Sequence, residues 1–242
     1  MNIKSAQILI VWIIVLNSVP VFSQLFQFPE IIEYNIFKND VKTPEKSIFI
    51  FEKLGRYIGT SNTTFRFIDP KKKQINEIHT YLRSLDYSYQ SSIVRCNAKK
   101  INEMSLVQGK GFDQSDTMMI KFQTDKRTGF EPLCKPLLFI DINTALIVSA
   151  HAAFMNYNYH TKCYFYSFTD SKLKLAKMHL NGTKTIQNNG KTMLCKRFQV
   201  HSEEDDEIID ILIYKDSKGY CIPAAISWKN LQIKFHINKI VL

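Results

Sequence analysis

Short apolar runs separated by turn-forming residues dominate the chain beyond residue 90. The runs are rich in β-branched and aromatic side chains, and between them lie Asn181-Gly182, Asn189-Gly190 and a turn-like segment at 216–219. Such runs are typical of β-strands joined by tight turns. The predicted strands are 117–122, 137–142, 162–168, 208–214, 220–228 and 231–237. The last run alternates between apolar and polar residues, as expected for a strand with one buried face.

The N-terminal third has a less decisive pattern. Asp69-Pro70 could begin a helix, because Ile75, Ile78, Leu82 and Leu85 follow at nearly helical spacing. The pattern alone therefore predicts an α+β fold. With 242 residues, 45% of them hydrophobic and 22% charged, the chain has the composition of an ordinary globular domain or of two small lobes.

The first residues predict a secretory signal peptide. Lys4 supplies a positive charge, an apolar stretch follows at 8–16, and small residues precede a cleavage site after Ser23. The apolar stretch is shorter than the roughly 20 residues that span a membrane. We expect a secreted, extracellular protein that begins at Gln24 and has no membrane anchor. Removal of the signal would lower the formal net charge only from +10 to +9, since Lys4 is its single charged residue.

Secretion changes how the cysteines and asparagines are interpreted. The five cysteines are expected to form disulfides, with at least one left over: Cys96, Cys134, Cys163, Cys195 and Cys221. Asn62 and Asn181 each begin an acceptor sequon for N-glycosylation, which predicts surface loops at both.

Two basic clusters, Lys71–Lys73 and Lys196-Arg197, could meet a heparin-like glycosaminoglycan. They lack interleaved aromatic residues, so we expect solvated loops and no nucleic-acid binding. His160 and Cys163 have loose metal-ligand spacing, and the acidic run 202–207 could attract calcium, but neither completes a known ligand pattern. No metal site and no cofactor are expected.

Five short segments occur in the order found in one large family. "SDTMMIKF", "FEPLCKP", "KCYFYSF", "TMLCKRF" and "AAISWKN" resemble segments of the chymotrypsin-like (trypsin-type) serine proteases. The resemblance implies an all-β domain over 24–242 made of two packed antiparallel six-stranded β-barrels. Barrel one would cover about 31–135 and barrel two about 136–242. It also implies a disulfide between Cys163 and Cys221, and leaves Cys96–Cys134 as an unsupported option.

The resemblance also places the residues of a catalytic triad. Asp116 matches the aspartate and His79 matches the histidine base, whereas His151 lies too late in the chain for that role. Glu207 stands in the position of the nucleophilic serine. Ser217 is the alternative nucleophile, although 215–219 is better interpreted as a hairpin turn.

Loss of the serine implies a secreted, catalytically inactive serine protease homologue that acts by binding a protein, such as a protease, a zymogen or a receptor. Two alternatives remain open at this point. One is an active serine endopeptidase that uses His79, Asp116 and Ser217. The other is a basic, secreted glycan-binding module.

Overall fold

One large β-sheet and one helix make up the described part of the chain. The computed structural model describes residues 27–54, 60–83, 89–110, 116–124, 128–132, 138–156, 158–167 and 172–242. The strands are β1 (Ile31–Lys38), β2 (Val41–Leu54), β3 (Thr60–Asp69), β4 (Gln74–Arg83), β5 (Tyr89–Cys96), β6 (Lys99–Lys110), β7 (Asp116–Thr124), β8 (Thr128–Pro132), β9 (Leu138–Ile140), β10 (His160–Ser167), β11 (Lys172–Asn188), β12 (Lys191–Ser202), β13 (Ile208–Lys215), β14 (Cys221–Trp228) and β15 (Ile233–Val241). The helix is α2 (Ile142–Met155).

The strands follow one another across the sheet almost in chain order. The order is β8-β7-β6-β5-β4-β3-β2-β1-β15-β14-β13-β12-β11-β10-β9, with the first and last full-length strands paired at β1–β15. Every neighbouring pair is antiparallel except β9–β10, which is parallel. A parallel pair needs a long crossover, and α2 supplies it between β9 and β10.

Two-residue turns explain why so many consecutive strands pair. Asn39–Asp40, Asn97–Ala98 and Asn189–Gly190 each join two strands, and both residues of each turn have positive φ. Turns of this hand match the right-handed twist of the flanking strands, and asparagine and glycine adopt them at low cost. The local sequence therefore specifies tight hairpins, and a chain of hairpins gives the meander.

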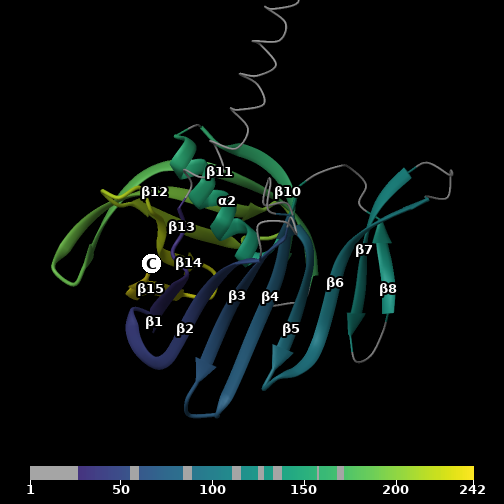
Figure 1. Cartoon of the computed structure of the whole chain (residues 1–242), viewed down its shortest axis with the longest axis horizontal. Helices are drawn as coiled ribbons and strands as arrows, with labels where there is room; N and C mark the ends of the chain where they lie inside the picture. Colours follow the sequence, from purple (N-terminus) through teal and green to yellow (C-terminus); the bar gives the residue numbers. More distant parts are fainter. Residues whose placement is uncertain are drawn as a thin grey trace, which may run out of the picture.

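The sheet curls around α2, which lies on its concave side (Figure 1). Ten of the fourteen helical residues are buried, so the helix is covered on nearly all sides. Asp141 caps its N-terminus by accepting a hydrogen bond from the Thr144 amide at 2.8 Å, and Asn156 ends it in a left-handed conformation. The apolar core between helix and sheet is richest under β13 and β14, where Ile209 and Ile211 are fully buried.

The roll brings distant strands together without pairing them. Asn102 on β6 donates a side-chain hydrogen bond to the Tyr166 hydroxyl on β10 at 2.9 Å, and β9 approaches β5. Beyond this contact, β7 and β8 continue away from the rolled part of the sheet (Figure 1).

The prediction of an all-β fold is confirmed, but the prediction of two six-stranded barrels is wrong. One continuous sheet stands where the resemblance implied two six-stranded barrels, because β1 pairs with β15 and ties the two ends of the chain together. All six predicted strands are present in β7, β9, β10, β13, β14 and β15, although Leu231 lies in a turn. The helix considered from residue 75 is instead β4, since pairing with β3 and β5 overrides the local spacing. The predicted signal peptide lies outside the described residues.

Helices that could cross a membrane are not found among the described residues, because α2 is too short.

Candidate functional site

The residues predicted to form a catalytic triad do not come together. His79 lies on β4, where its Nδ1 is 3.0 Å from the Thr64 hydroxyl and its Nε2 is 3.3 Å from a Glu77 carboxylate oxygen. Asp116 is the first residue of β7, and β5 and β6 separate that strand from β4. Three strand spacings correspond to about 14 Å. The histidine thus has partners other than the aspartate assigned to it.

Glu207 has a structural partner instead of a catalytic one. Its Oε2 accepts a hydrogen bond from the Lys174 ammonium at 2.6 Å, and its Oε1 accepts one from Ser167 at 3.2 Å. Both ionic side chains are almost fully buried, and Asp205 also contacts Lys174 at 2.7 Å. The cluster fixes the loop before β13 onto β11. A buried ion pair of this kind holds a conformation, because removal of one partner would leave the other charge uncompensated.

Ser217 lies in the turn between β13 and β14, as the hairpin interpretation predicted. Asp216 accepts hydrogen bonds from the amides of Lys218 and Tyr220, each at 2.9 Å, and Gly219 has a φ of +93°. Ser217 is exposed at the tip of this turn. It is therefore a turn residue and not a nucleophile.

The predicted disulfide between Cys163 and Cys221 is absent from the structure, where both are free, buried thiols. They lie on β10 and β14, which are separated by β11, β12 and β13. Cys96 and Cys195 are also free, whereas Cys134 lies outside the described residues. Burial raises the pKa of Cys163 to about 12 and those of Cys195 and Cys221 to about 11. These thiols are protonated at neutral pH and are poor nucleophiles.

The two sequons lie on strands and not on loops. Asn62 lies on β3, where its side-chain amide donates to Glu52 at 3.3 Å and its carbonyl oxygen is buried. This position makes it a poor glycosylation acceptor. Asn181 is exposed at a bulge of β11 and contacts Gln199, so glycosylation there stays a prediction.

Metal binding gains no support from the described residues, which contain no group of three or more His, Cys, Asp and Glu side chains placed to hold an ion. His160 and His179 face each other across β10 and β11 with ring centroids 5.9 Å apart. Glu203 and Asp205 of the acidic run instead pair with lysines.

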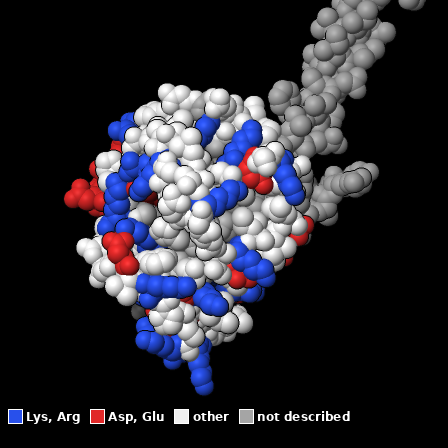
Figure 2. All heavy atoms as spheres, turned by 90° about the vertical axis from the view of Figure 1, so that its left-hand side faces the viewer, with Lys and Arg blue, Asp and Glu red and all other residues white. Residues whose placement is uncertain are grey.

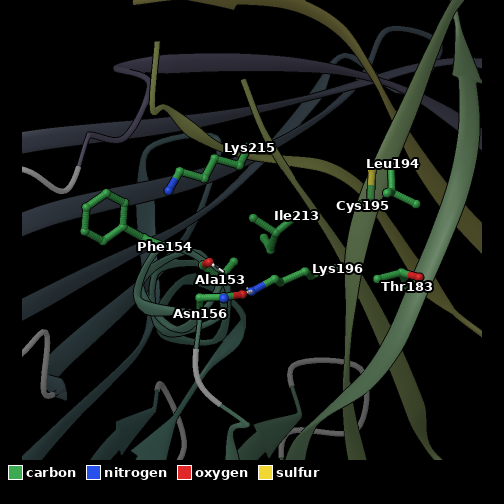
Figure 3. A pocket seen from close by; sticks show the side chains of 9 residues that line it. All are labelled: Ala153, Phe154, Asn156, Thr183, Leu194, Cys195, Lys196, Ile213 and Lys215. Carbon is green, nitrogen blue, oxygen red and sulfur yellow. Dashed lines mark hydrogen bonds between the residues drawn. The ribbon is translucent and has the colours of Figure 1, made fainter. Parts of the chain in front are cut away.

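A cavity beside the C-terminal end of α2 is the candidate functional site (Figure 3). Its volume is about 320 Å³, at the lower end of the range for small-molecule sites. Its wall comes from the helix end and from β11, β12 and β13. The lining residues are Ala153, Phe154, Asn156, Thr183, Leu194, Cys195, Lys196, Ile213 and Lys215.

Two lysines from neighbouring strands flank the cavity. Lys196 on β12 points toward the helix end, where its ammonium donates to the Ala153 carbonyl at 3.2 Å and to the Asn156 side chain. Lys215, the last residue of β13, places its ammonium 4.7 Å from the centre of the Phe154 ring. Partial burial, and then repulsion from Lys215, lower the pKa of Lys196, while Cys221 acts weakly in the opposite direction.

The residues around the cavity are better suited to binding an anion than to catalysing a reaction. Ile213, Leu194, Ala153 and the Phe154 ring offer apolar surface, and the two ammonium groups repel each other. An anionic group between them would relieve that repulsion. Within the described residues the cavity is lined by one thiol, Cys195, whose raised pKa opposes nucleophilic catalysis.

Sequence reasoning missed this site because it missed the helix. The run from 142 to 155 was considered only for its histidine, and Lys196 was assigned to a solvated loop. The signal was present: Asp141 is followed three residues later by Thr144 and then by an alanine-rich apolar run. Such a capping residue before a run of strong helix formers predicts a helix.

Comparisons with known proteins correct the family assignment. No protein-family model and no curated protein matches the chain. Among solved structures, a β-barrel-like protein of the domain of unknown function DUF1849 from Brucella abortus matches with a TM-score of 0.56 and 10% identity, over 90% of this chain and 99% of that one. A DUF1089 family protein from Pseudomonas aeruginosa matches with a TM-score of 0.38 and 9% identity, over 78% and 91%.

At such low identity the first likeness shows the fold alone, which is β-barrel-like. The resemblance to chymotrypsin-like serine proteases is therefore wrong. The two functions drawn from it, an inactive protease homologue and an active endopeptidase using Ser217, are wrong as well. The quoted segments are short strand patterns that a β-rich chain of another family can also contain.

Proposed function

We propose that this protein is a secreted binding protein whose cavity takes a small amphiphilic anion, such as a medium-length alkyl carboxylate or phosphate. The observation that carries the proposal is the pairing of two lysines with an apolar wall around a cavity of about 320 Å³. Ligand sites in proteins are commonly apolar hollows with a few charged groups that fix the orientation.

Each part of the cavity has a role in this proposal. The alkyl part of the ligand packs against Ile213, Leu194 and the Phe154 ring. The anionic head lies between Lys196 and Lys215 and accepts charge-assisted hydrogen bonds. Lys215 already lies over an aromatic face and is otherwise exposed, so it can turn toward a ligand at little cost.

Secretion is part of the proposal and is supported by Lys4, the apolar stretch at 8–16 and the small residues before position 24. A protein partner and a glycosaminoglycan contact stay predictions. Mass spectrometry of protein recovered from the medium of expressing cells would test secretion, with Gln24 as the expected first residue.

Ligand binding is tested by titrating the protein with a fluorescent alkyl carboxylate and with the matching uncharged alcohol. Lys215→Gln should weaken carboxylate binding about fivefold to tenfold and leave alcohol binding nearly unchanged, because only the anion uses the ammonium. Lys218→Gln, three residues away in the exposed turn and outside the cavity lining, is the matched control. Equal effects of the two substitutions, or no saturable binding, would refute the proposal.

A further inference from the structure

Five of the described hairpin turns lie along one edge of the sheet. Four of them carry lysines, and the fifth, the β12–β13 turn at 203–207, is acidic and lies next to the β14–β15 turn, where the Lys229 amide donates to the Ile208 carbonyl at 3.0 Å. In an antiparallel meander alternate turns fall on the same edge, which places the β1–β2, β3–β4 and β5–β6 turns together along the bottom of Figure 1. The β14–β15 turn joins them because β15 pairs with β1, and the Asn39 amide donates to the Gln232 carbonyl at 3.0 Å. We call residues 38–42, 69–75, 97–101 and 229–234 the lysine rim.

The lysine rim is strongly basic. It contains nine lysines and two aspartates. Five of the lysines form ion pairs: Lys38 with Glu45, Lys72 with Asp69, Lys100 with Glu103, Lys229 with Asp210 and Lys234 with Asp40. Lys42, Lys71 and Lys73 form no ion pair with any described residue. Figure 2, in which this edge again points down, shows Lys and Arg side chains gathered there.

Each of the four turns also carries one exposed large aliphatic side chain. Val41 is 67% exposed, Ile75 40%, Ile101 39% and Leu231 41%. They represent half of the eight large hydrophobic side chains that are exposed in the described part of the chain. On each of the four turns an exposed aliphatic side chain therefore lies within a few residues of lysines.

We propose that the lysine rim docks on the surface of a bilayer that contains anionic phospholipid. Lysines attract the negative headgroups, while the aliphatic tips enter the boundary between headgroups and acyl chains. Long lysine side chains can reach up to the headgroups while the turn backbone approaches the surface.

The aliphatic side chains favour a membrane over the glycan or nucleic acid that basic clusters alone suggest. A sulfated glycan stays in water and gains nothing from Val41 or Ile75, and single-stranded nucleic acid would need aromatic stacking surfaces. The short apolar stretch at 8–16 predicts no membrane anchor, and the sequence pattern leaves Lys71–Lys73 as a solvated loop. Only pairing of β1 with β15 brings the fourth turn beside the other three.

The inference is independent of the proposed ligand. Lys215 ends β13 next to the turn at 216–220, which lies on the opposite edge of the sheet. Loss of vesicle binding and loss of carboxylate binding should therefore be separable.

The test is co-sedimentation of the mature protein with phosphatidylcholine vesicles that contain either no or 30% phosphatidylserine. The protein should bind only the anionic vesicles, and a fourfold variant (Val41→Ser, Ile75→Ser, Ile101→Ser, Leu231→Ser) should bind about tenfold more weakly or worse. Lys71→Gln, Lys72→Gln and Lys73→Gln together should weaken binding about tenfold.

Matched controls lie at the opposite edge of the sheet. Val241→Ser with Leu242→Ser removes two equally exposed aliphatic residues, and Lys191→Gln with Lys218→Gln and Lys239→Gln removes three lysines. Both controls should change vesicle binding less than twofold. Because all the substituted side chains are exposed or at turns, melting temperatures should match that of the wild type.

Two results would overturn the inference. One is the absence of binding to anionic vesicles at low salt. The other is vesicle binding that the fourfold aliphatic variant leaves unchanged, which would reassign the rim to purely electrostatic contact with a polyanion such as heparin.

Discussion

The two ends of helix α2 lie in different surroundings. At the N-terminal end, Asp141 accepts hydrogen bonds from the Thr80 hydroxyl at 2.5 Å and from the Thr144 hydroxyl at 2.9 Å, and all three side chains are fully buried. Asn143 extends the network by donating to Thr80 at 2.8 Å and to the Ile78 carbonyl at 2.9 Å. The N-terminal end of the helix is therefore held by a buried network of polar side chains.

At the C-terminal end the helix packs on apolar strands. Ala150, Ala152 and Ala153 are buried, and the helix contacts β13 and β14, where Ile211 and Ile226 are also buried. Small residues let the helix approach closely here, and the cavity opens where this packing stops. The comparison shows that directional hydrogen bonds fix the depth and angle of the helix at one end. At the other end, apolar contact supplies stability and leaves room for a ligand.

Removal of apolar packing should have the largest effect. Ile211→Ala deletes fully buried methyl groups and should lower the free energy of unfolding by about 4 kcal/mol, measured by urea denaturation. Ile75→Ala, at an isoleucine that is 40% exposed, is the matched control and should cost under about 1 kcal/mol. Similar losses in the two variants would contradict the assignment of the core to β13.

Substitutions at the polar N-terminal end of α2 should have the second largest effect on stability. Asp141→Ala removes the helix cap and leaves the Thr80 hydroxyl and the Thr144 amide without their acceptor, which should cost about 3 kcal/mol. Asp141→Asn keeps one acceptor oxygen and the shape of the side chain, so it should recover part of that loss. If both variants were as stable as the wild type, the network would have no structural role.

A pH titration should separate the charge of Asp141 from its hydrogen bonds. Burial raises the pKa of this carboxyl above its ordinary value of 3.8, and the hydrogen bonds from Thr144 and Thr80 oppose the shift. The folded state therefore binds the proton more tightly than the unfolded state does. The stability of the wild type relative to Asp141→Asn should be greatest below pH 3.8 and should fall as the pH rises through the folded pKa. A difference that grows with pH would contradict this sign.

The cavity end should tolerate loss of its exposed lysine with the smallest change in stability. Lys215→Gln should shift the free energy of unfolding by under about 0.5 kcal/mol, because the ammonium makes one exposed contact with the Phe154 ring. Chemical denaturation without ligand would check this. A loss of several kcal/mol would mean that Lys215 supports the fold and not a ligand.

Turns and strands were predictable where short sequence patterns specify them. Asn189-Gly190 marked a hairpin turn, the segment 215–219 was identified as another, and the apolar runs around Ile211 and Phe235 gave strands in the expected places. Turn residues and two-residue periodicity act over a few neighbours, so they need no knowledge of the rest of the chain.

The failures concern contacts between distant residues. His79 was assigned a partner at Asp116, but strand pairing gives it Thr64 on the next strand. Glu207 was assigned to a nucleophile position, and the buried partner that defines it, Lys174, is 33 residues away in the chain. The similarity of short segments to another family does not reveal which distant side chains contact each other.

The sequence by itself determined the strands and hairpin turns beyond residue 90, because tight turns and alternating side chains leave few other ways to satisfy the backbone hydrogen bonds of these segments. Only the tertiary structure decided that β1 closes against β15, that the run at 142–155 becomes a helix on the concave side of the sheet, and that the four turns of the lysine rim share one edge. The physical reason is that these outcomes depend on burial and pairing between segments far apart in the chain. Thr80 and Asp141, 61 residues apart, acquire their roles only once the sheet has curled around the helix.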